Sequence, residues 1–331
     1  MRNIIIISSF DPITNKMVED ILKFNDNETK FILIPTYSKY ASIDDRAYMI
    51  NIALKELNIN YELNLILSKK YKETIDLSKL LNAIPFNEKD DIFVLFCDEK
   101  TVIVDKNKIK TYKIKLDLNN LNYDKSREVR VLKNIDINEK TLDFIIRKNL
   151  YFMQIITRYI SGHRLEHSIS VAKLSYKIAL ANDLPKPDDY FIAGLLHDLG
   201  KKISDEESLN YMEKYYRYYV NLPTYAYHQF IGAFLSKILF PNTSGDVYKA
   251  ILFHCTGNAN MSDIQKVIYA ADKIEPTRGY DSKSLIDTCL KDFNQGFIEV
   301  LKENMKFLKE NSGDPSRNSL TKRCLECYIE E

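Results

Sequence analysis

Short runs of β-branched and aromatic residues recur over roughly the first 115 positions of the chain. These runs are Ile4–Ile7, Phe31–Ile34, Leu63–Leu67, Ile92–Phe96 and Thr101–Val104. Stretches with helical patterning, such as Arg46–Leu57, lie between them. Continuous apolar strands are typical of a sheet covered on both faces, and strand–helix alternation favours parallel pairing. The pattern therefore predicts an α/β domain built on a parallel sheet.

The helical period takes over from about residue 140, and strand-like runs become rare. No segment rich in Pro, Gly or Ser marks the change, and we place the junction near Tyr151. We therefore expect an α/β domain over residues 1–152 and an all-α domain over residues 153–331.

Charge and composition narrow the functional classes. Lys and Arg total 47 against 46 Asp and Glu, a net charge of +1 that argues against holding nucleic acid or acidic lipid by bulk charge. No apolar run approaches the roughly 18 residues of a membrane helix. Five scattered cysteines do not make a disulfide scaffold, and we expect Cys324 and Cys327 to pack in a terminal helix. The sequence predicts a cytoplasmic protein without membrane or nucleic-acid partners, and it is compatible with a homodimer.

Glycine and histidine are confined to the second half. All nine glycines lie at or beyond Gly162, and all five histidines lie between His163 and His254. A glycine-rich phosphate loop and histidine chemistry are therefore both excluded from the first 161 residues. Catalysis is expected in the second half.

Six polar residues continue the apolar stripes of predicted helices in that half. They are His167, His197, Asp198, His228, His254 and Asp272. His167, for example, shares a helix face with Val171 and Leu174. Each unpaired polar group costs roughly 1–3 kcal/mol when buried, and a shared metal ion removes that cost. We therefore predict a metal site; a metal-free hydrogen-bonded network is the alternative.

The order His, His-Asp, His, His, Asp resembles that of the HD-domain metal-dependent phosphohydrolase superfamily. The strings AGLLHDLGK, HCTG and ADKIEPTRGY closely resemble one branch of it, the bacterial symmetrical bis(5'-nucleosyl)-tetraphosphatases. The resemblance covers about residues 155–300 and implies an all-helical HD domain.

The resemblance also implies a dinuclear centre. The minimal superfamily set holds one ion and corresponds here to His167, His197, Asp198 and Asp272. His228 and His254 supply ligands for a second ion, and we expect Asp198 and a solvent hydroxide to bridge the two. The resemblance implies iron; imidazole and carboxylate ligands without thiolate also suit manganese or another first-row metal.

The expected chemistry is in-line attack of activated water at phosphorus. We assign catalytic roles to Asp198 and Lys201. Lys201, Thr256, Gly257 and Arg278 are the predicted contacts of the substrate phosphates, on their match to the family strings.

The first half resembles nicotinate-mononucleotide adenylyltransferases, which implies a Rossmann-like, nucleotidyltransferase-type domain. The matching remnants of the nucleotide site are Ser9, Phe10, Asp11, Thr14, Ser126 and Arg130. The sequence differs from the family motif at positions that take part in catalysis, because Lys16 and Met17 stand where the motif has Gly and His. Without that histidine the transferring phosphate loses its usual stabilisation. We therefore interpret this domain as degenerate.

The sequence as a whole predicts a hydrolase that cuts diadenosine tetraphosphate into two ADP. Three alternatives remain open. The first is an active or bifunctional nicotinate-nucleotide adenylyltransferase of NAD biosynthesis. The second is an HD hydrolase with another nucleotide substrate, and the third is a non-catalytic nucleotide sensor.

Overall fold

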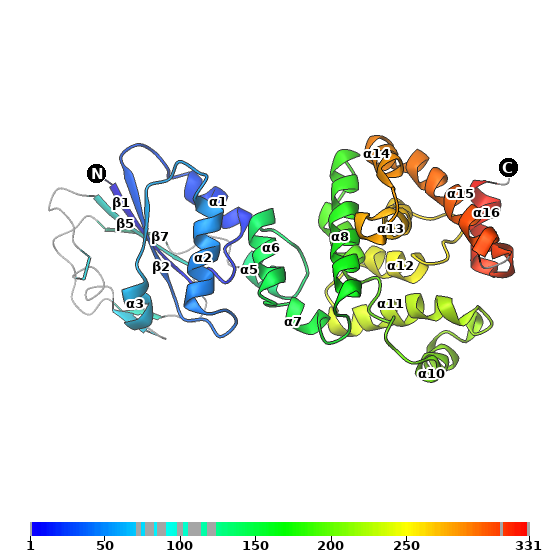
Figure 1. Cartoon of the computed structure of the whole chain (residues 1–331). Helices are drawn as coiled ribbons and strands as arrows, with labels where there is room; N and C mark the ends of the chain where they lie inside the picture. The colour runs from blue at the N-terminus through cyan, green and yellow to red at the C-terminus, as the bar shows by residue number, and fades with distance from the viewer. Residues whose placement is uncertain are drawn as a thin grey trace. The chain divides into compact units, whose positions relative to one another are not determined.

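The computed structural model divides into two compact units. The α/β unit comprises Met1–Val131 and Ile135–Met153, and the helical unit comprises Leu132–Asn134 and Gln154–Glu331. The structure describes residues 2–70, 74–76, 83–84, 91–97, 102–104, 114–117, 124–311 and 314–329. The two units are drawn in Figure 1, coloured along the chain.

A five-stranded parallel sheet forms the centre of the α/β unit. Its strand order is β3-β2-β1-β5-β7, and every neighbouring pair is parallel. An order that runs outward from β1 to both edges is that of doubly wound nucleotide-binding folds. The strands are β1 (Arg2–Ser8), β2 (Thr29–Pro35), β3 (Tyr61–Leu63), β5 (Asp91–Cys97) and β7 (Ile114–Asp117). The isoleucines of β1 are at most 2% exposed, as expected for a strand covered on both faces.

Helices connect the strands and begin at polar caps. The Thr14 hydroxyl accepts from the Met17 N–H at the start of α1 (Asn15–Leu22), and the Ser42 hydroxyl accepts from the Asp45 N–H at the start of α2 (Ile43–Leu54). Two further helices, α5 (Asp124–Arg130) and α6 (Glu139–Arg147), lie near the end of the unit. Helix α2 packs against β2 and α6.

Two of the predicted strands need correction. The run Leu63–Leu67 is a strand only at its first residue, because α3 (Leu65–Lys70) begins within it. The Asn64 side chain accepts from the Leu67 N–H (3.1 Å) and so initiates this helix. Strand β6 (Val102–Val104) pairs with β4 (Thr74–Asp76) in a separate two-stranded sheet, and Thr101 lies outside the described residues.

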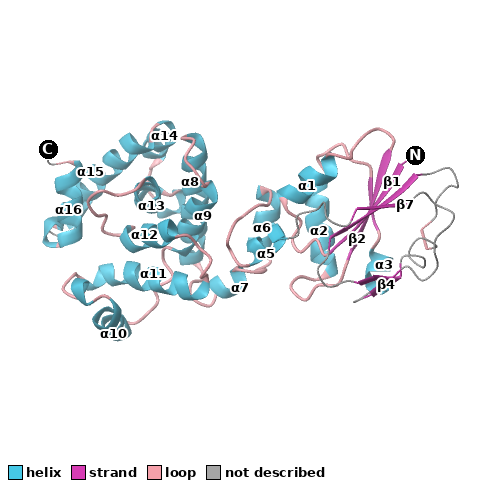
Figure 2. Cartoon of the chain, turned by 180° about the vertical axis from the view of Figure 1, so that it is seen from behind, coloured by secondary structure: helices cyan, strands magenta, loops and turns pink. Residues whose placement is uncertain are grey.

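The helical unit has no strand within its described residues (Figure 2). Helix α7 (Met153–Ile156) leads into it. The remaining helices are α8 (His163–Ala181), α9 (Pro187–Leu196), α10 (Asp205–Tyr215), α11 (Tyr227–Leu239), α12 (Gly245–Phe253), α13 (Asp263–Ile274), α14 (Lys283–Lys291), α15 (Phe293–Asn311) and α16 (Ser319–Tyr328). Short 3₁₀ turns at Arg217–Tyr219, Thr224–Ala226, Pro276–Arg278 and Pro315–Arg317 complete it.

Helix α9 packs against α8 and α12, and α12 packs against α11 and α13. The backbone after α9 also approaches α11 closely at Gly200. A Cβ atom there would lie 2.5 Å from the His228 carbonyl oxygen and 2.7 Å from the Gly232 nitrogen. A side chain at Gly200 would therefore push these two segments apart. Among the described helices, none is both long and apolar enough to cross a membrane.

Candidate metal centre

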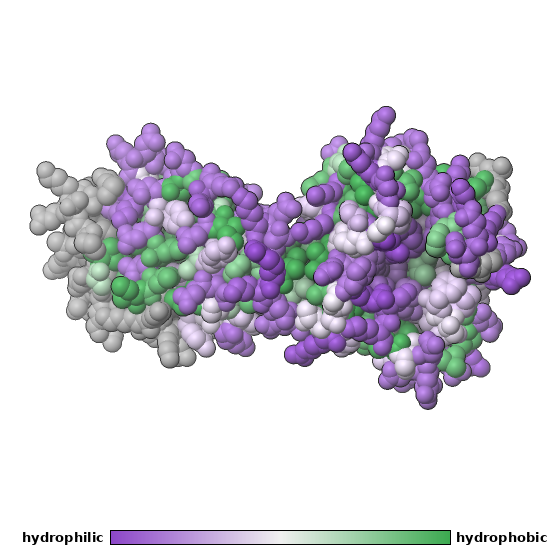
Figure 3. All heavy atoms as spheres, in the orientation of Figure 1, coloured by the Kyte–Doolittle hydropathy of each residue, from purple (hydrophilic) through white to green (hydrophobic). Residues whose placement is uncertain are grey.

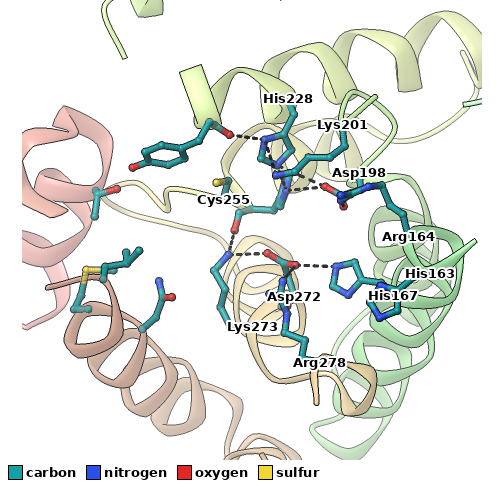
Figure 4. Close-up of a pocket in the computed structure, with 16 residues that line it drawn as sticks. His163, Arg164, His167, Asp198, Lys201, His228, Cys255, Asp272, Lys273 and Arg278 are labelled. Atoms are coloured by element: carbon teal, nitrogen blue, oxygen red, sulfur yellow. Dashed lines mark hydrogen bonds and ion pairs between the residues drawn. The ribbon is translucent and has the colours of Figure 1, made fainter. Parts of the chain in front are cut away.

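Five helices bring the six predicted metal ligands to one place. Figure 4 labels His167, Asp198, His228 and Asp272 among them. His167 lies in the first turns of α8, and His197 and Asp198 follow the last residue of α9. His228 is the second residue of α11, His254 caps the end of α12, and Asp272 lies near the end of α13. All six side chains are buried, with at most 7% of each residue exposed.

The ligand atoms of these residues form three overlapping groups, in each of which all atoms lie within 4.8 Å of one another. The groups are His167–His197–Asp198, His197–His254–Asp272 and Asp198–His228–His254. Asp198 Oδ1 lies 3.8 Å from His197 Nε2, 3.6 Å from His228 Nε2 and 3.9 Å from His254 Nε2. Asp198 is thus the carboxylate placed to serve more than one ion.

The histidine tautomers follow from the partners of Nδ1. In three of the rings Nδ1 faces the backbone carbonyl three residues earlier: Gly194 for His197 (2.7 Å), Tyr225 for His228 (2.7 Å) and Ile251 for His254 (2.8 Å). A carbonyl only accepts, so Nδ1 must carry the hydrogen in each ring. In a neutral ring Nε2 then presents its lone pair to the centre, as metal-bound histidines do.

His228 and His254 show why a cation fits this arrangement. Their Nε2 atoms are 3.1 Å apart, and both rings donate from Nδ1 to the backbone. Burial lowers the pKa of His228 to about 4, with the charge of Lys201 acting in the same direction, and burial also lowers the pKa of His254 well below its usual value. Both rings are therefore neutral near pH 7, and two lone pairs face each other across a hydrogen-bond distance. A bound cation turns this repulsion into coordination.

His167 has a different partner. Its Nδ1 lies 2.8 Å from Oε1 of Glu275, a carboxylate held in turn by the Thr277 N–H and hydroxyl (2.7 Å each). Burial opposes ionisation of Glu275, but hydrogen bonds from His167, Ser170 and Thr277 lower its pKa. A carboxylate behind a ligating imidazole fixes the ring and raises its basicity.

Cationic side chains compensate the two ligand carboxylates. Arg164 Nη1 lies 2.6 Å from Asp198 Oδ2, Lys273 Nζ 2.7 Å from Asp272 Oδ2, and Arg278 Nη2 2.6 Å from Asp272 Oδ1. Burial alone would raise the pKa of Asp272, but Lys273 and the hydrogen bonds from histidine lower it well below its usual value. Asp198 likewise has a lowered pKa, because the charge of His197, whose own pKa is raised, outweighs the effect of burial. Both carboxylates are ionised and able to bind a metal.

A cavity of about 590 Å³ opens onto this centre. Five of the six predicted ligands, all but His197, line it together with the cations Arg164, Lys201, Lys273 and Arg278. His163, whose sequence context suggested no role, also lines it (Figure 4). On the face drawn in Figure 3, hydrophilic residues gather around a hollow in the helical unit.

The structure separates the predicted substrate contacts into two pairs. Lys201 and Arg278 line the cavity, whereas Thr256 and Gly257 do not. The Thr256 hydroxyl is buried and donates to the Gly257 carbonyl (2.9 Å). Gly257 has φ +67°, and a Cβ there would lie 2.6 Å from Cys324 Sγ. Both residues pack against α16 rather than face a ligand.

Three residues at the centre did not emerge from the sequence. They are Arg164, Lys273 and Glu275. Arg164 lies three residues before His167, so helical spacing places both on one face and could have indicated it. Lys273 directly follows a ligand, and Glu275 lies beyond the end of α13, where the helical period no longer predicts direction.

The remnants of the nucleotide site in the α/β unit lie close together around Asp11. The Asp11 carboxylate accepts from the Ser38 and Tyr151 hydroxyls, and its carbonyl accepts from Arg130. The Ser126 hydroxyl donates to the Pro12 carbonyl (2.7 Å). The other remnants are the helix cap Thr14, Phe10 with φ 47° and Ser9, whose hydroxyl is buried without a hydrogen-bond partner.

Residue Met17 occupies the position of the missing motif histidine. It is fully buried, and its sulfur lies 3.8 Å from the Ser126 hydroxyl. Arg46 donates to the carbonyls of Ser9 (2.7 Å) and Thr36 (2.6 Å). The Asp11 carboxylate and carbonyl are thus bound within the chain itself, whereas the Ser9 hydroxyl is not.

Comparisons with known proteins agree with the site geometry. Residues 164–277 match the family model described as "HD domain". A Mycoplasma genitalium protein named "Probable nicotinate-nucleotide adenylyltransferase/Ap4A hydrolase" is 24% identical over 94% of this chain and 100% of its own length. The Bacillus subtilis "Bis(5'-nucleosyl)-tetraphosphatase, symmetrical" is 28% identical over 47% of this chain and 86% of its own length.

A solved structure from Clostridium acetobutylicum, described as a "predicted HD superfamily hydrolase involved in NAD metabolism", is 27% identical with a TM-score of 0.47. It aligns over 52% of this chain and 93% of its own. The six buried His and Asp residues, the family match and the curated relatives lead to one conclusion. The helical unit carries an HD domain similar to that of symmetrical tetraphosphatases, in a chain similar over most of its length to adenylyltransferase/Ap4A hydrolase proteins.

Proposed function

We propose that this protein is a metal-dependent phosphohydrolase that cleaves dinucleoside tetraphosphates symmetrically, producing two ADP from diadenosine tetraphosphate. The observation that carries the proposal is the pair of neutral imidazoles whose Nε2 atoms face each other at 3.1 Å beside Asp198. The printed names of the Mycoplasma and Bacillus relatives supply the substrate class.

The donor set fits two metal ions. His167 Nε2 lies 3.2 Å from His197 Nε2 and 3.1 Å from Asp272 Oδ1. His228 Nε2 lies 3.1 Å from His254 Nε2 and 3.6 Å from Asp198 Oδ1. Imidazole and carboxylate donors suit first-row metals such as iron or manganese. When bound, the ions supply Lewis acidity, which lowers the pKa of water and draws charge from a phosphoryl oxygen.

The chain itself supplies charge and orientation. Arg164, Lys273 and Arg278 face the cavity with part of their charge used on ligand carboxylates, and Lys201 faces it from beside His228. We assign these cations to the nonbridging oxygens of the substrate, where charge develops during phosphoryl transfer. Glu275 acts behind His167 by keeping its Nδ1 protonated and its Nε2 directed at the ion.

The test is product analysis with the full chain, purified anaerobically and loaded with iron or manganese. Diadenosine tetraphosphate is the substrate, and nucleotides are separated by ion-exchange chromatography. ADP as the only product, with about two ions per chain, is the expected result. ATP plus AMP would contradict symmetrical cleavage. Tight binding without turnover would favour a nucleotide sensor instead.

The α/β unit is, in the same proposal, a nucleotidyltransferase fold that has lost adenylyl transfer. The support is local: Met17 fills the histidine position, and the Asp11 carboxylate is bound by Ser38 and Tyr151. Nicotinate mononucleotide with Mg-ATP is expected to give no dinucleotide. Formation of that product would show the unit to be an active transferase.

A further inference from the structure

We infer that the end of the cavity formed by α15, α16 and Tyr225 binds the nucleoside of a nucleotide whose phosphates lie at the metal centre. This end is lined by Tyr225, Asn304, Met305, Leu308 and Thr321, which we call the nucleoside wall. The inference rests on the proposed function, because it assumes that the metal centre receives phosphate. It assigns a binding role to α15 and α16, which lie beyond residues 164–277 of the HD match.

The chemistry of the lining changes across the cavity. Apart from the metal ligands, α8, α13 and the loop after α9 contribute His163 and the cations Arg164, Lys273 and Lys201. The nucleoside wall carries no charged side chain. A polyphosphate requires the cationic lining, and a base with its ribose requires the uncharged nucleoside wall. One cavity with both ends fits a nucleotide better than it fits an inorganic polyphosphate.

The wall offers an aromatic ring and apolar side chains. Tyr225 is 54% exposed, and its hydroxyl accepts from Asn318 Nδ2 (3.3 Å), which restrains the ring. Met305 and Leu308 lie one turn apart on α15 and are mostly buried. Flat aromatic rings and thioethers are good partners for a base, because stacking needs only a polarisable apolar face.

Asn304 adds a group that can recognise the edge of a base. Its Nδ2 donates to the Tyr269 hydroxyl (2.9 Å), which fixes the plane of the amide. The amide keeps further donor and acceptor capacity, and such a pair can match an adenine edge. The Thr321 hydroxyl already donates to the Thr256 carbonyl (3.2 Å), so Thr321 shapes the wall through its methyl group.

The wall is rigid because the hydrophobic core supports it from behind. Met305 belongs to a buried cluster with Tyr269, Phe297, Leu301 and Leu325. The cavity volume of about 590 Å³ lies inside the roughly 300–1,000 Å³ that small-molecule sites span. Tyr225 also joins the two ends, since its carbonyl accepts from Nδ1 of His228.

The experiment compares two ligands that differ only in the nucleoside. ADP and pyrophosphate are titrated calorimetrically into the manganese-loaded full chain, its Tyr225→Ala variant and its Asn304→Ala variant. Matched controls are Tyr218→Ala, at an 81% exposed tyrosine, and Asn311→Ala, at an exposed asparagine on the same helix as Asn304. Metal content is measured for every protein.

ADP is expected to bind the parent protein at least about tenfold more tightly than pyrophosphate does. Each wall variant should lose roughly tenfold in ADP affinity, with pyrophosphate affinity and metal content unchanged and both controls like the parent. Equal affinities for ADP and pyrophosphate in the parent, or wall variants that bind ADP normally, would overturn the inference.

The two failures are distinguishable. If diadenosine tetraphosphate is hydrolysed normally by the wall variants and their ADP affinity is unchanged, the nucleoside wall is wrong and the hydrolase stands. If the parent hydrolyses no dinucleotide but binds ADP through Tyr225 and Asn304, the wall stands and the proposed reaction is wrong.

Discussion

The two units bury polar clusters of opposite kinds. Around Asp11 in the α/β unit, acceptors face donors: the hydroxyls of Ser38 and Tyr151 bind the carboxylate. In the helical unit, acceptors face acceptors, because the Nε2 atoms of His228 and His254 are 3.1 Å apart while both Nδ1 hydrogens are bound to the backbone. In the first cluster the Asp11 carboxylate is bound within the chain itself, and in the second the facing acceptors form an arrangement that suits a cation. Burial of polar residues alone therefore does not indicate a metal site; the direction of their lone pairs does.

The largest expected effect tests the helical unit. Asp198→Ala should reduce hydrolysis of diadenosine tetraphosphate by about a thousandfold or more, because Oδ1 of this residue lies within 3.9 Å of three histidine Nε2 atoms. Initial rates and metal content measure it. The exposed Asp287→Ala serves as the control. A variant that kept a tenth of the parent rate would have an activation free energy only roughly 1.4 kcal/mol higher. That result would show that Asp198 is not required for catalysis.

The next test asks whether the α/β cluster serves stability alone. Met17→Ala opens a cavity at a fully buried site and should destabilise the α/β unit by about 3 kcal/mol, leaving hydrolysis unchanged. Hydrogen exchange of β1 and α1 measures the local stability, with the exposed Asn15→Ala on the same helix as control. Two results would contradict the difference between the units: unchanged protection of the β1 and α1 amides from hydrogen exchange in Met17→Ala, or a changed rate of hydrolysis.

A smaller effect sharpens the role of Glu275. Glu275→Gln keeps the shape of the side chain but removes the charge behind His167, and should weaken metal binding by roughly ten- to hundredfold. Competition with a fluorescent chelator measures the affinity, and the exposed Glu303→Gln on α15 is the control. An unchanged affinity for metal in Glu275→Gln would show that the charge of Glu275 does not support the metal site.

The pH dependence of the metal-free protein follows from His228. Burial depresses its folded-state pKa to about 4, so between that value and about 6.5 the unfolded chain binds more protons. Stability of the metal-free helical unit should fall as the pH drops from 7 to 5, by on the order of 2 kcal/mol. Urea unfolding followed by circular dichroism tests the sign, and His228→Gln should flatten the curve. Rising stability over this range would contradict a neutral His228.

Thr256→Val gives the smallest expected effect. The hydroxyl is bound to Gln229 and Gly257 inside the protein, so its removal should cost about 1 kcal/mol of stability without changing KM. Urea unfolding and steady-state kinetics measure the two quantities. A tenfold rise in KM would restore Thr256 to the substrate site, from which the structure separates it.

The sequence predicted the burial of the six His and Asp residues better than it predicted their surroundings, for a physical reason. Helical spacing is local. The apolar residues that share a helix face with His167 or with Asp272 are therefore enough to show that each side chain points inward. The Nδ1 partners of His197, His228 and His254 are also local, three residues back along the chain. Glu275 lies 108 positions from His167, and no local period connects them.

The same distinction holds for the fold. The β1 isoleucines form a buried run and were readable as a strand. Leu63–Leu67 is apolar except for Asn64, and the side chain of this residue caps a helix that takes up most of the run. The nucleoside wall depends on how α15 and α16 pack on the domain, which amphipathic patterning does not specify.

The close approach at Gly200 has a consequence for reading mutational surveys. Any side chain there would meet the His228 carbonyl and the Gly232 nitrogen, at 2.5 and 2.7 Å from its Cβ. The segments that carry Asp198 and His228 can therefore lie this close together only because Gly200 has no Cβ atom. A saturation screen for activity would score Gly200 as intolerant as the ligands, although a glycine has no side chain to touch metal or nucleotide. Loss of activity in such a screen would report, at this position, that the backbone cannot accommodate a side chain. Measuring the metal content of each variant would distinguish this cause from the loss of a catalytic group.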